Sequence, residues 1–139
     1  MSYYLGKINK TEYLILKDKN KIKLNFDTTC FQGSKQFFQN KYLNVLNPDN
    51  TIYNLETEIE EFVKDKLIGF NLKSNIIFDQ KQFLQFKLTS DVVIAPETKL
   101  NLDIEIDKIK INEKIKSYQI ILNLVKFKIL SNTEIKNLL

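Results

Sequence analysis

Residues 99–130 decide the fold, and they read KLNLDIEIDKIKINEKIKSYQIILNLVKFKIL. Apolar side chains alternate with polar ones along both halves of this stretch, which is the pattern of a β-strand with one buried face. The apolar phase moves from even to odd positions near Asp107–Lys108, and again near Leu124–Val125. Each change of phase predicts a β-bulge or a break in the strand. Residues 112–116 are the expected loop between the two strands.

Two long strands that each change face imply one of two arrangements. Either the antiparallel sheet is strongly bent, or residues 99–130 leave the domain body as an extended two-stranded arm. With 139 residues, of which 43% are hydrophobic, the chain is expected to form a single domain over 1–139. The predicted fold class is α+β, with an N-terminal β-hairpin, one or two helices, and a larger bent antiparallel sheet packed on the main helix.

The main helix is predicted from an apolar stripe that recurs at helical spacing. Asn54 is placed to cap this helix, and Gly69 is placed just beyond its end. A second helix is predicted within residues 34–45, where aromatic side chains recur at roughly helical spacing. The stripe of the main helix consists of Leu55, Ile59, Phe62, Val63 and Leu67.

The N-terminal hairpin is predicted from an apolar run at residues 13–16 and an alternating run at 22–26. Turn-forming residues at 17–20 separate the two runs. A short strand is expected at 3–8, and a short helix is expected to begin at Ser131 or Asn132. Further strands are expected at 70–72, 76–78, 84–88 and 92–94. Turns are expected at 79–81 and around Pro96.

The composition excludes most familiar hydrolase chemistry. The chain has no histidine, and all 21 of its basic residues are lysine. Without imidazole, a Ser-His-Asp triad, a Cys-His pair or a histidine-bearing zinc site cannot form. No catalytic residue, cofactor or metal ligand is predicted, and the chain is not expected to be an enzyme. Carboxylates do cluster at residues 56–61 and 103–107, but these clusters are interpreted as a solvated helix face and the outward face of a strand paired with lysines.

The single cysteine, Cys30, allows no internal disulfide, which suits a reducing compartment, and the expected location is the cytoplasm. No apolar run approaches the roughly 18 residues of a membrane span, so no membrane insertion is expected. The N-terminus also lacks a continuous apolar leader segment, so the chain is interpreted as a soluble, mature protein.

Lysines interleaved with aromatic residues raise a second possibility, a small oligonucleotide-binding β-barrel that contacts single-stranded nucleic acid. Such proteins combine a cationic groove with stacking rings. This alternative requires its lysines to share a face with exposed aromatic side chains, and the absence of arginine counts against it. The residues assigned to it are Lys21, Lys23, Lys126 and Lys128.

The order of elements over residues 42–106 resembles the lysozyme-like baseplate wedge proteins of contractile phage tails and type VI secretion systems. Members of that family are small, non-enzymatic subunits that bridge baseplate and sheath. The chain departs from the family after the main helix, where residues 67–72 stand in place of its Glu-Pro-Arg motif, so no motif residue is carried across. The segments that carry the resemblance are Leu43–Asp49, Leu55–Phe62, Phe83–Leu88 and Leu100–Ile106.

The function expected from these observations is a non-catalytic structural subunit of a larger protein assembly. The resemblance makes a baseplate component of a contractile injection or type VI secretion apparatus its most specific form. Long strands that change phase are suited to strand addition between chains, so other protein subunits are the expected partners. Tyr118, Ile120 and Phe127 are the predicted interface residues.

Overall fold

A computed structural model of the chain describes residues 2–37, 40–47, 49–88 and 93–131. The described residues form β-strands and one α-helix. In chain order the elements are β1 (Tyr3–Lys7), β2 (Glu12–Lys17), β3 (Lys23–Phe37), β4 (Asn40–Leu46), α1 (Thr51–Val63), β5 (Asn71–Leu72), β6 (Ile77–Asp79), β7 (Lys81–Leu88), β8 (Lys99–Asn112) and β9 (Ser117–Ser131).

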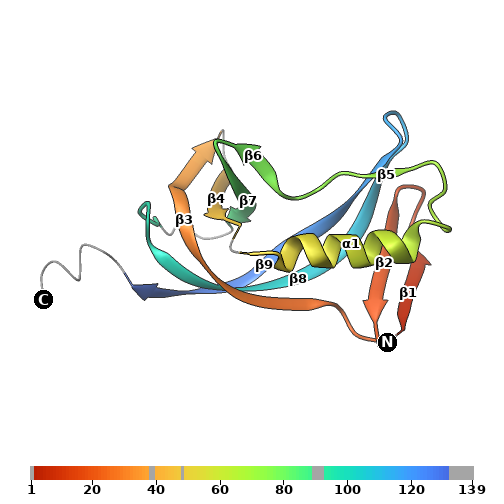
Figure 1. The fold of residues 1–139 in the computed structure, drawn as a ribbon, viewed down its shortest axis with the longest axis horizontal. Helices are drawn as coiled ribbons and strands as arrows, with labels where there is room; N and C mark the ends of the chain where they lie inside the picture. Colours follow the sequence, from red (N-terminus) through yellow and green to blue (C-terminus); the bar gives the residue numbers. More distant parts are fainter. Residues whose placement is uncertain (1, 38–39, 48, 89–92, 132–139) are drawn as a thin grey trace, which may run out of the picture.

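The long strand β8 organises the sheet. Strand β9 pairs with β8 in antiparallel fashion along one edge, from Asn112 to Lys99 of β8. The other edge of β8 is shared, because β2 pairs with its C-terminal half and β3 with its N-terminal half. The strand order is β1-β2-β8-β3-β4-β7-β6, with β9 beside β8 and β5 beside β9. In Figure 1, helix α1 lies across one face of the β8–β9 pair, and β4, β6 and β7 fold over beyond its N-terminal end.

Both predicted changes of phase are confirmed as irregularities in the β8–β9 ladder. Ile106 is opposite Leu122 and Lys108 is opposite Ile121, so Asp107 is an extra residue on β8. Further along the ladder, Val125 is an extra residue on β9. Each extra residue moves the following apolar side chains back to the inner face, as a bulge does. The β8–β9 pair lies within the sheet through the β2 and β3 neighbours of β8, and does not stand apart as a two-stranded arm.

The predicted helix within residues 34–45 is wrong, since the described residues of this range, 34–37 and 40–45, lie in strands. Strand β3 pairs with β8 through Thr29 and then with β4 from Cys30 onward, with a register shift between Cys30 and Ser34. The strand therefore bends from one part of the sheet into the other. Aromatic spacing alone could not separate a helix from a bulged strand at this place.

The N-terminal hairpin exists, but between other strands than predicted. Strand β1 pairs with β2, and the turn at Lys17–Asn20 is present with a single bridge between those two residues. After this turn β3 pairs with β8, and not with β2. The local turn was predicted correctly, and the partner of the strand after it was not.

Helix α1 is confirmed, with a start at Thr51 that is earlier than predicted. Its N-cap residue is Asn50, which makes no side-chain capping bond, and Asn54 lies inside the helix. The Asp49 carboxylate accepts hydrogen bonds from the backbone N–H and the hydroxyl of Thr51 at the helix start. Gly69, beyond the end of the helix, has φ of +86°, a left-handed conformation that favours glycine.

Two clusters of buried side chains form the core. The first lies between β3, β4, β7, β8 and β9, and the second lies between α1 and the far half of the β8–β9 pair, with Leu24 and Leu122 packed against both. The fold is mostly antiparallel sheet with one helix in the described residues, and the sheet is not closed. The α+β class is confirmed in this coarse form. Within the described residues 93–95 no strand is present. Ser131, one of the two expected starts of the terminal helix, is the last residue of β9, and the rest of that helix lies outside the described residues.

Candidate interaction surface

The outer face of the sheet, on the side away from α1, carries charged residues sorted by strand. At residues 103–107 of β8 these are carboxylates, and lysines from both sides of β8 lie against them. The face also carries Asp27 on β3 and lysines at 108 and 110 of β8. The Lys21 ammonium lies 3.4 Å from Glu105 and 3.9 Å from Asp107. On the other side, Lys126 lies 3.5 Å from Asp103. The interpretation of the acidic residues at 103–107 as an outward strand face paired with lysines is therefore confirmed.

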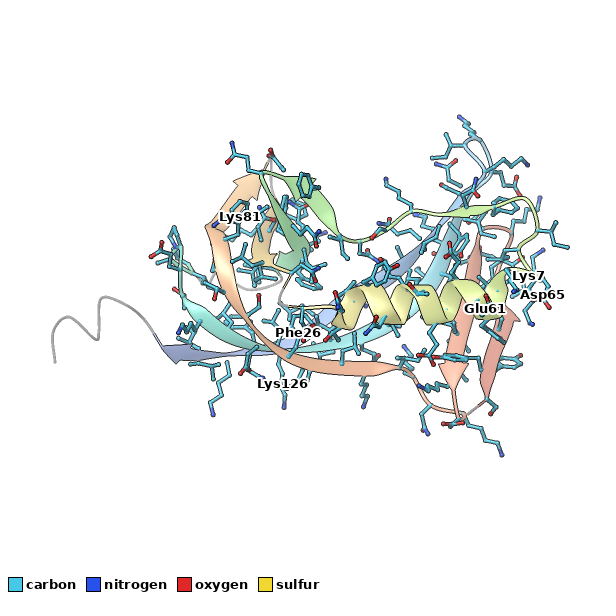
Figure 2. The ribbon with its side chains drawn as sticks, in the orientation of Figure 1. Lys7, Phe26, Glu61, Asp65, Lys81 and Lys126 are labelled. Carbon is cyan, nitrogen blue, oxygen red and sulfur yellow. The ribbon has the colours of Figure 1, made fainter. Side chains whose placement is uncertain are left out.

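The lysines assigned to nucleic-acid binding lie on this face, but among carboxylates. Lys23 is in register with Glu105, and Lys128 is in register with the neutral Asn101. The nearby rings of Phe26 and Phe127 are in register with Leu102, which is buried on the inner face. Figure 2 shows Lys126 and Phe26 on opposite sides of the sheet. The lysines thus lack the shared patch of exposed aromatic rings that the alternative requires among the described residues of these strands.

Two of the three predicted interface residues are inside the protein, which corrects their assignment. Tyr118 is 3% exposed and Ile120 is fully buried in the core between α1 and the sheet. Burial and the nearby carboxylates of Glu60 and Glu56 raise the pKa of Tyr118 to about 12. Phe127 is half-buried and packs against the other core cluster. The alternation of apolar residues indicated that these side chains are covered, but it did not indicate whether the same chain or a partner covers them.

The structure places the accessible apolar residues further along β9. In the described part of the chain, the outer edge of β9 pairs only with β5, at Ser117 and Tyr118. Beyond these residues Val125 is 60% exposed, Ile129 50% and Leu130 46%. An edge strand of this kind presents unpaired backbone N–H and C=O groups beside apolar side chains. We name residues 123–130 the open edge of β9.

A buried carboxylate closes the other half of this edge. Glu56 of α1 is 4% exposed, and accepts hydrogen bonds from the Ser74 hydroxyl at 2.6 Å and from the backbone and side-chain nitrogens of Asn75 at 2.8 and 3.1 Å. The Asn75 amide also donates to the backbone oxygen of Ile120 at 2.7 Å. We name Glu56, Ser74 and Asn75 the clasp. It joins the helix, the loop after β5 and the edge of β9.

The sequence analysis missed this role for Glu56, which was expected on a solvated helix face. A glutamate next to Leu55 in a run of glutamates carries no local signal that it is buried. Its partners Ser74 and Asn75 are remote in sequence, so only the tertiary fold brings them to the carboxylate.

Polar contacts also hold the β1–β2 hairpin in place. The Tyr3 hydroxyl donates a 2.5 Å hydrogen bond to Glu58 of α1, and Lys17 lies 3.4 Å from the same carboxylate. Burial and then the Glu58 hydrogen bond raise the pKa of Tyr3, and the Tyr3 bond lowers the pKa of Glu58. On the other side of the hairpin, a hydrogen bond from Lys108 lowers the pKa of Glu12. These contacts hold the β1–β2 hairpin against α1 and β8, and this structural role is sufficient to explain why the charged groups lie close together.

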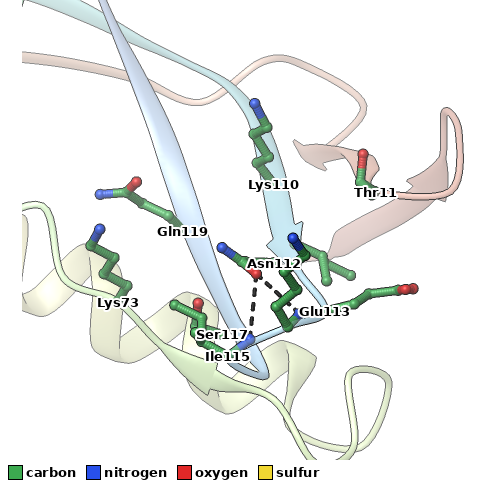
Figure 3. Close-up of a pocket in the computed structure, with 10 residues that line it drawn as sticks. Thr11, Lys73, Lys110, Asn112, Glu113, Ile115, Ser117 and Gln119 are labelled. Carbon is green, nitrogen blue, oxygen red and sulfur yellow. Dashed lines mark hydrogen bonds between the residues drawn. The ribbon is translucent and has the colours of Figure 1, made fainter.

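A hollow with a volume of about 580 Å³ lies beside the tip of the β8–β9 hairpin. Figure 3 shows Lys73, Lys110 and Gln119 on its wall with their polar ends directed to different places. The side-chain oxygen Oδ1 of Asn112 accepts hydrogen bonds from the backbone N–H groups of Lys114 at 3.1 Å and Ile115 at 3.4 Å. These lining residues do not converge on a point where a substrate atom could react.

Other candidate chemical groups are dispersed. Within the described residues, no three Cys, Asp or Glu side chains are grouped so that they could hold a metal ion. Cys30 is 1% exposed in the first core cluster, where its thiol is out of reach of solvent. The helix of the described chain is too short and too polar to cross a membrane.

Comparison with known proteins adds no relative. No family model, no curated protein and no solved structure matches this chain. The functional argument therefore rests on the surface geometry described above.

Proposed function

We propose that this protein is a non-catalytic subunit of a larger protein assembly, and that it joins a partner chain by sheet extension along the open edge of β9. One observation carries the proposal. The edge is left unpaired over residues 123–130 in the described chain, while Val125, Ile129 and Leu130 beside it are 46–60% exposed. An added strand satisfies the backbone groups of the edge and covers these side chains.

The proposal has a more specific form and a proposed location. The resemblance of residues 42–106 to baseplate wedge proteins makes a contractile injection or type VI secretion apparatus the most specific candidate assembly. We place the protein in the cytoplasm, because its only cysteine is buried and leaves no thiol for a disulfide with another chain. Nucleic acid is the weaker partner, because Lys21 and Lys126 each lie beside a carboxylate of β8.

Hydrogen exchange of the native complex tests the proposal. The complex is isolated from the cells that make the protein, and amide exchange is compared with that of the free chain. Sheet extension is expected to slow exchange over residues 123–130, while residues 3–7 of β1, an edge strand at the other end of the sheet, serve as the internal control. A chain that stays monomeric in native mass spectrometry of those cells, or a complex in which 123–130 exchange as in the free chain, would overturn it.

A further inference from the structure

The charge pattern of the outer face predicts the chemistry of the partner strand, an inference that rests on the proposed function. Around residues 103–107 of β8, the face carries lysine before and on β3, carboxylates on β8, and lysine on β9. Outside this region the pattern differs, because β3 carries a carboxylate at Asp27 and β8 carries lysines at 108 and 110. Ion pairs cross each boundary between these strands, with Lys21–Glu105 on one side of β8 and Lys126–Asp103 on the other. Around Asp103 and Glu105 the carboxylates of β8 therefore lie between lysines on both sides.

This arrangement of charges stops at the open edge of β9. The Lys126 side chain is 77% exposed, and its only described ion pair is with β8. Lys128 is opposite the neutral Asn101, whose amide nitrogen donates to Asn25 and Asp27. A carboxylate on the far side of β9 would face both ammonium groups at the distance of cross-strand neighbours.

The inner face of the same edge requires apolar side chains. Phe127 is opposite Leu102, and Ile129 is opposite Leu100, and both leucines are fully buried. Ile129 itself is 50% exposed. Side chains of a strand alternate between its two faces. A strand added to β9 could therefore present carboxylates to the lysines and apolar side chains to Phe127 and Ile129.

A second copy of this chain is disfavoured in the registers centred on the two lysines of the edge. When two β9 edges pair antiparallel about a twofold axis at residue 126, 127 or 128, Lys126 or Lys128 of one copy is set against Lys126 or Lys128 of the other. Like charges directly opposite each other destabilise a pair of strands. The same lysines that disfavour self-pairing in these registers favour a carboxylate partner.

We propose that the segment that adds to β9 is an extended peptide of another protein in which acidic and apolar residues alternate, with its carboxylates beside Lys126 and Lys128 and its apolar side chains over Phe127 and Ile129. The backbone of the edge provides affinity for any extended strand, and the two lysines select the acidic one.

Three short synthetic peptides test the selection, measured by fluorescence anisotropy against the full chain. Each alternates Val and Ile with one polar residue type, which is Glu, Thr or Lys. The Glu peptide is expected to bind about tenfold more tightly than the Thr peptide, from two favourable cross-strand pairs, and the Lys peptide more weakly than both. The preference for Glu is expected to decrease as salt is added.

A charge-reversal variant with a matched control sharpens the test. Lys126→Glu with Lys128→Glu is expected to reverse the order, so that the Lys peptide binds best. Lys10→Glu with Lys19→Glu changes the net charge equally at exposed turn positions outside the open edge of β9, and is expected to keep the original order. Circular dichroism of both variants verifies that the fold is retained.

Each other outcome is decisive. Equal binding of the three peptides, with residues 123–130 protected from exchange, would overturn the acidic partner and leave sheet extension standing. Dimerisation of the free chain through β9 in sedimentation experiments would overturn it in favour of a second copy. Binding of none of the peptides would also overturn it, and the exchange experiment on the native complex then decides separately whether sheet extension holds.

Discussion

The two halves of β9 have the same alternating pattern and very different surroundings. In residues 117–122 the apolar side chains lie under α1, and the strand edge is closed by β5 and the clasp. In residues 123–130 the edge pairs with no described strand, although β7 lies close to β9 and its Lys87 lines a hollow together with residues 122–125. Val125 and Ile129 are half or more exposed. We name the first half the covered half and compare it with the open edge.

This difference shows what alternation does and does not determine. The period of two fixes which side chains share a face, and both halves follow it through the bulge at Val125. Coverage of that face depends on elements remote in sequence, here α1 and the loop after β5. A covered half anchors the strand in the fold, and an unpaired edge that continues from it can serve as a template for another strand.

The largest expected effect on stability comes from a substitution in the covered half. Ile120→Ala removes a fully buried side chain and is expected to lower the free energy of unfolding by about 2–5 kcal/mol. Ile129→Ala is the matched control at a site that is 50% exposed, with an expected loss of at most about 1 kcal/mol. Urea denaturation followed by circular dichroism gives both values. Similar losses for the two variants would mean that the halves do not differ in coverage.

The clasp is expected to give the next largest effect. Glu56→Ala leaves the backbone and side-chain donors of Asn75 and the Ser74 hydroxyl without their acceptor, at a cost of about 1–3 kcal/mol. Glu60→Ala, an exposed position on the same helix, is the control with little expected change. In Glu56→Ala, hydrogen exchange of residues 71–76 is expected to rise toward the rate of the open edge. Unchanged exchange there would show that β5 closes the covered half without the clasp.

Local pattern predicted part of this fold and failed for identifiable reasons. Alternation over residues 99–130 was sufficient to place both strands, the loop and both bulges, because these features depend on neighbours in sequence. The stripe from Leu55 to Leu67 likewise predicted α1. The pairing of β3 with β8 could not be read from the turn at 17–20, because the choice between β2 and β8 is made by contacts remote in sequence.

The candidate surface was harder to predict than the fold. Tyr118 and Ile120 were expected at an interface, yet a long apolar side chain on a strand looks the same in sequence whether a helix of the same chain or a partner covers it. The open edge depends on where β5 stops, and a two-residue strand has almost no sequence signal. The outward direction of the carboxylates of β8 could be predicted, because acidic and apolar residues alternate along that one strand.

Alkaline pH provides a third test of the covered half. The pKa of Tyr118 is raised by burial to about 12, whereas tyrosine in an unfolded chain ionises near pH 10. Between these values the unfolded state releases its proton first, so the stabilisation is complete below about pH 10 and is lost as the pH rises toward 12. Tyr118→Phe is therefore expected to make stability fall less steeply over this range.

The control for this titration is Tyr53→Phe, which alters a ring that is 59% exposed on α1. Urea midpoints at several alkaline pH values are compared with those of the unmodified protein. Equal slopes for Tyr118→Phe and Tyr53→Phe would contradict the burial of the Tyr118 hydroxyl in the covered half.

The smallest expected effect lies at the open edge. Lys126→Ala removes an ion pair with Asp103 at 3.5 Å whose lysine side chain is 77% exposed, so solvent screening leaves an expected loss of stability below about 0.5 kcal/mol. A lysine that contributes so little to its own fold is free to act on a partner strand, and the same substitution is expected to weaken binding of the alternating Glu peptide. Urea denaturation and fluorescence anisotropy on one preparation measure the two effects together. A loss of stability as large as that of Glu56→Ala would instead make Lys126 a structural residue, and the open edge would then differ from the covered half only in exposure.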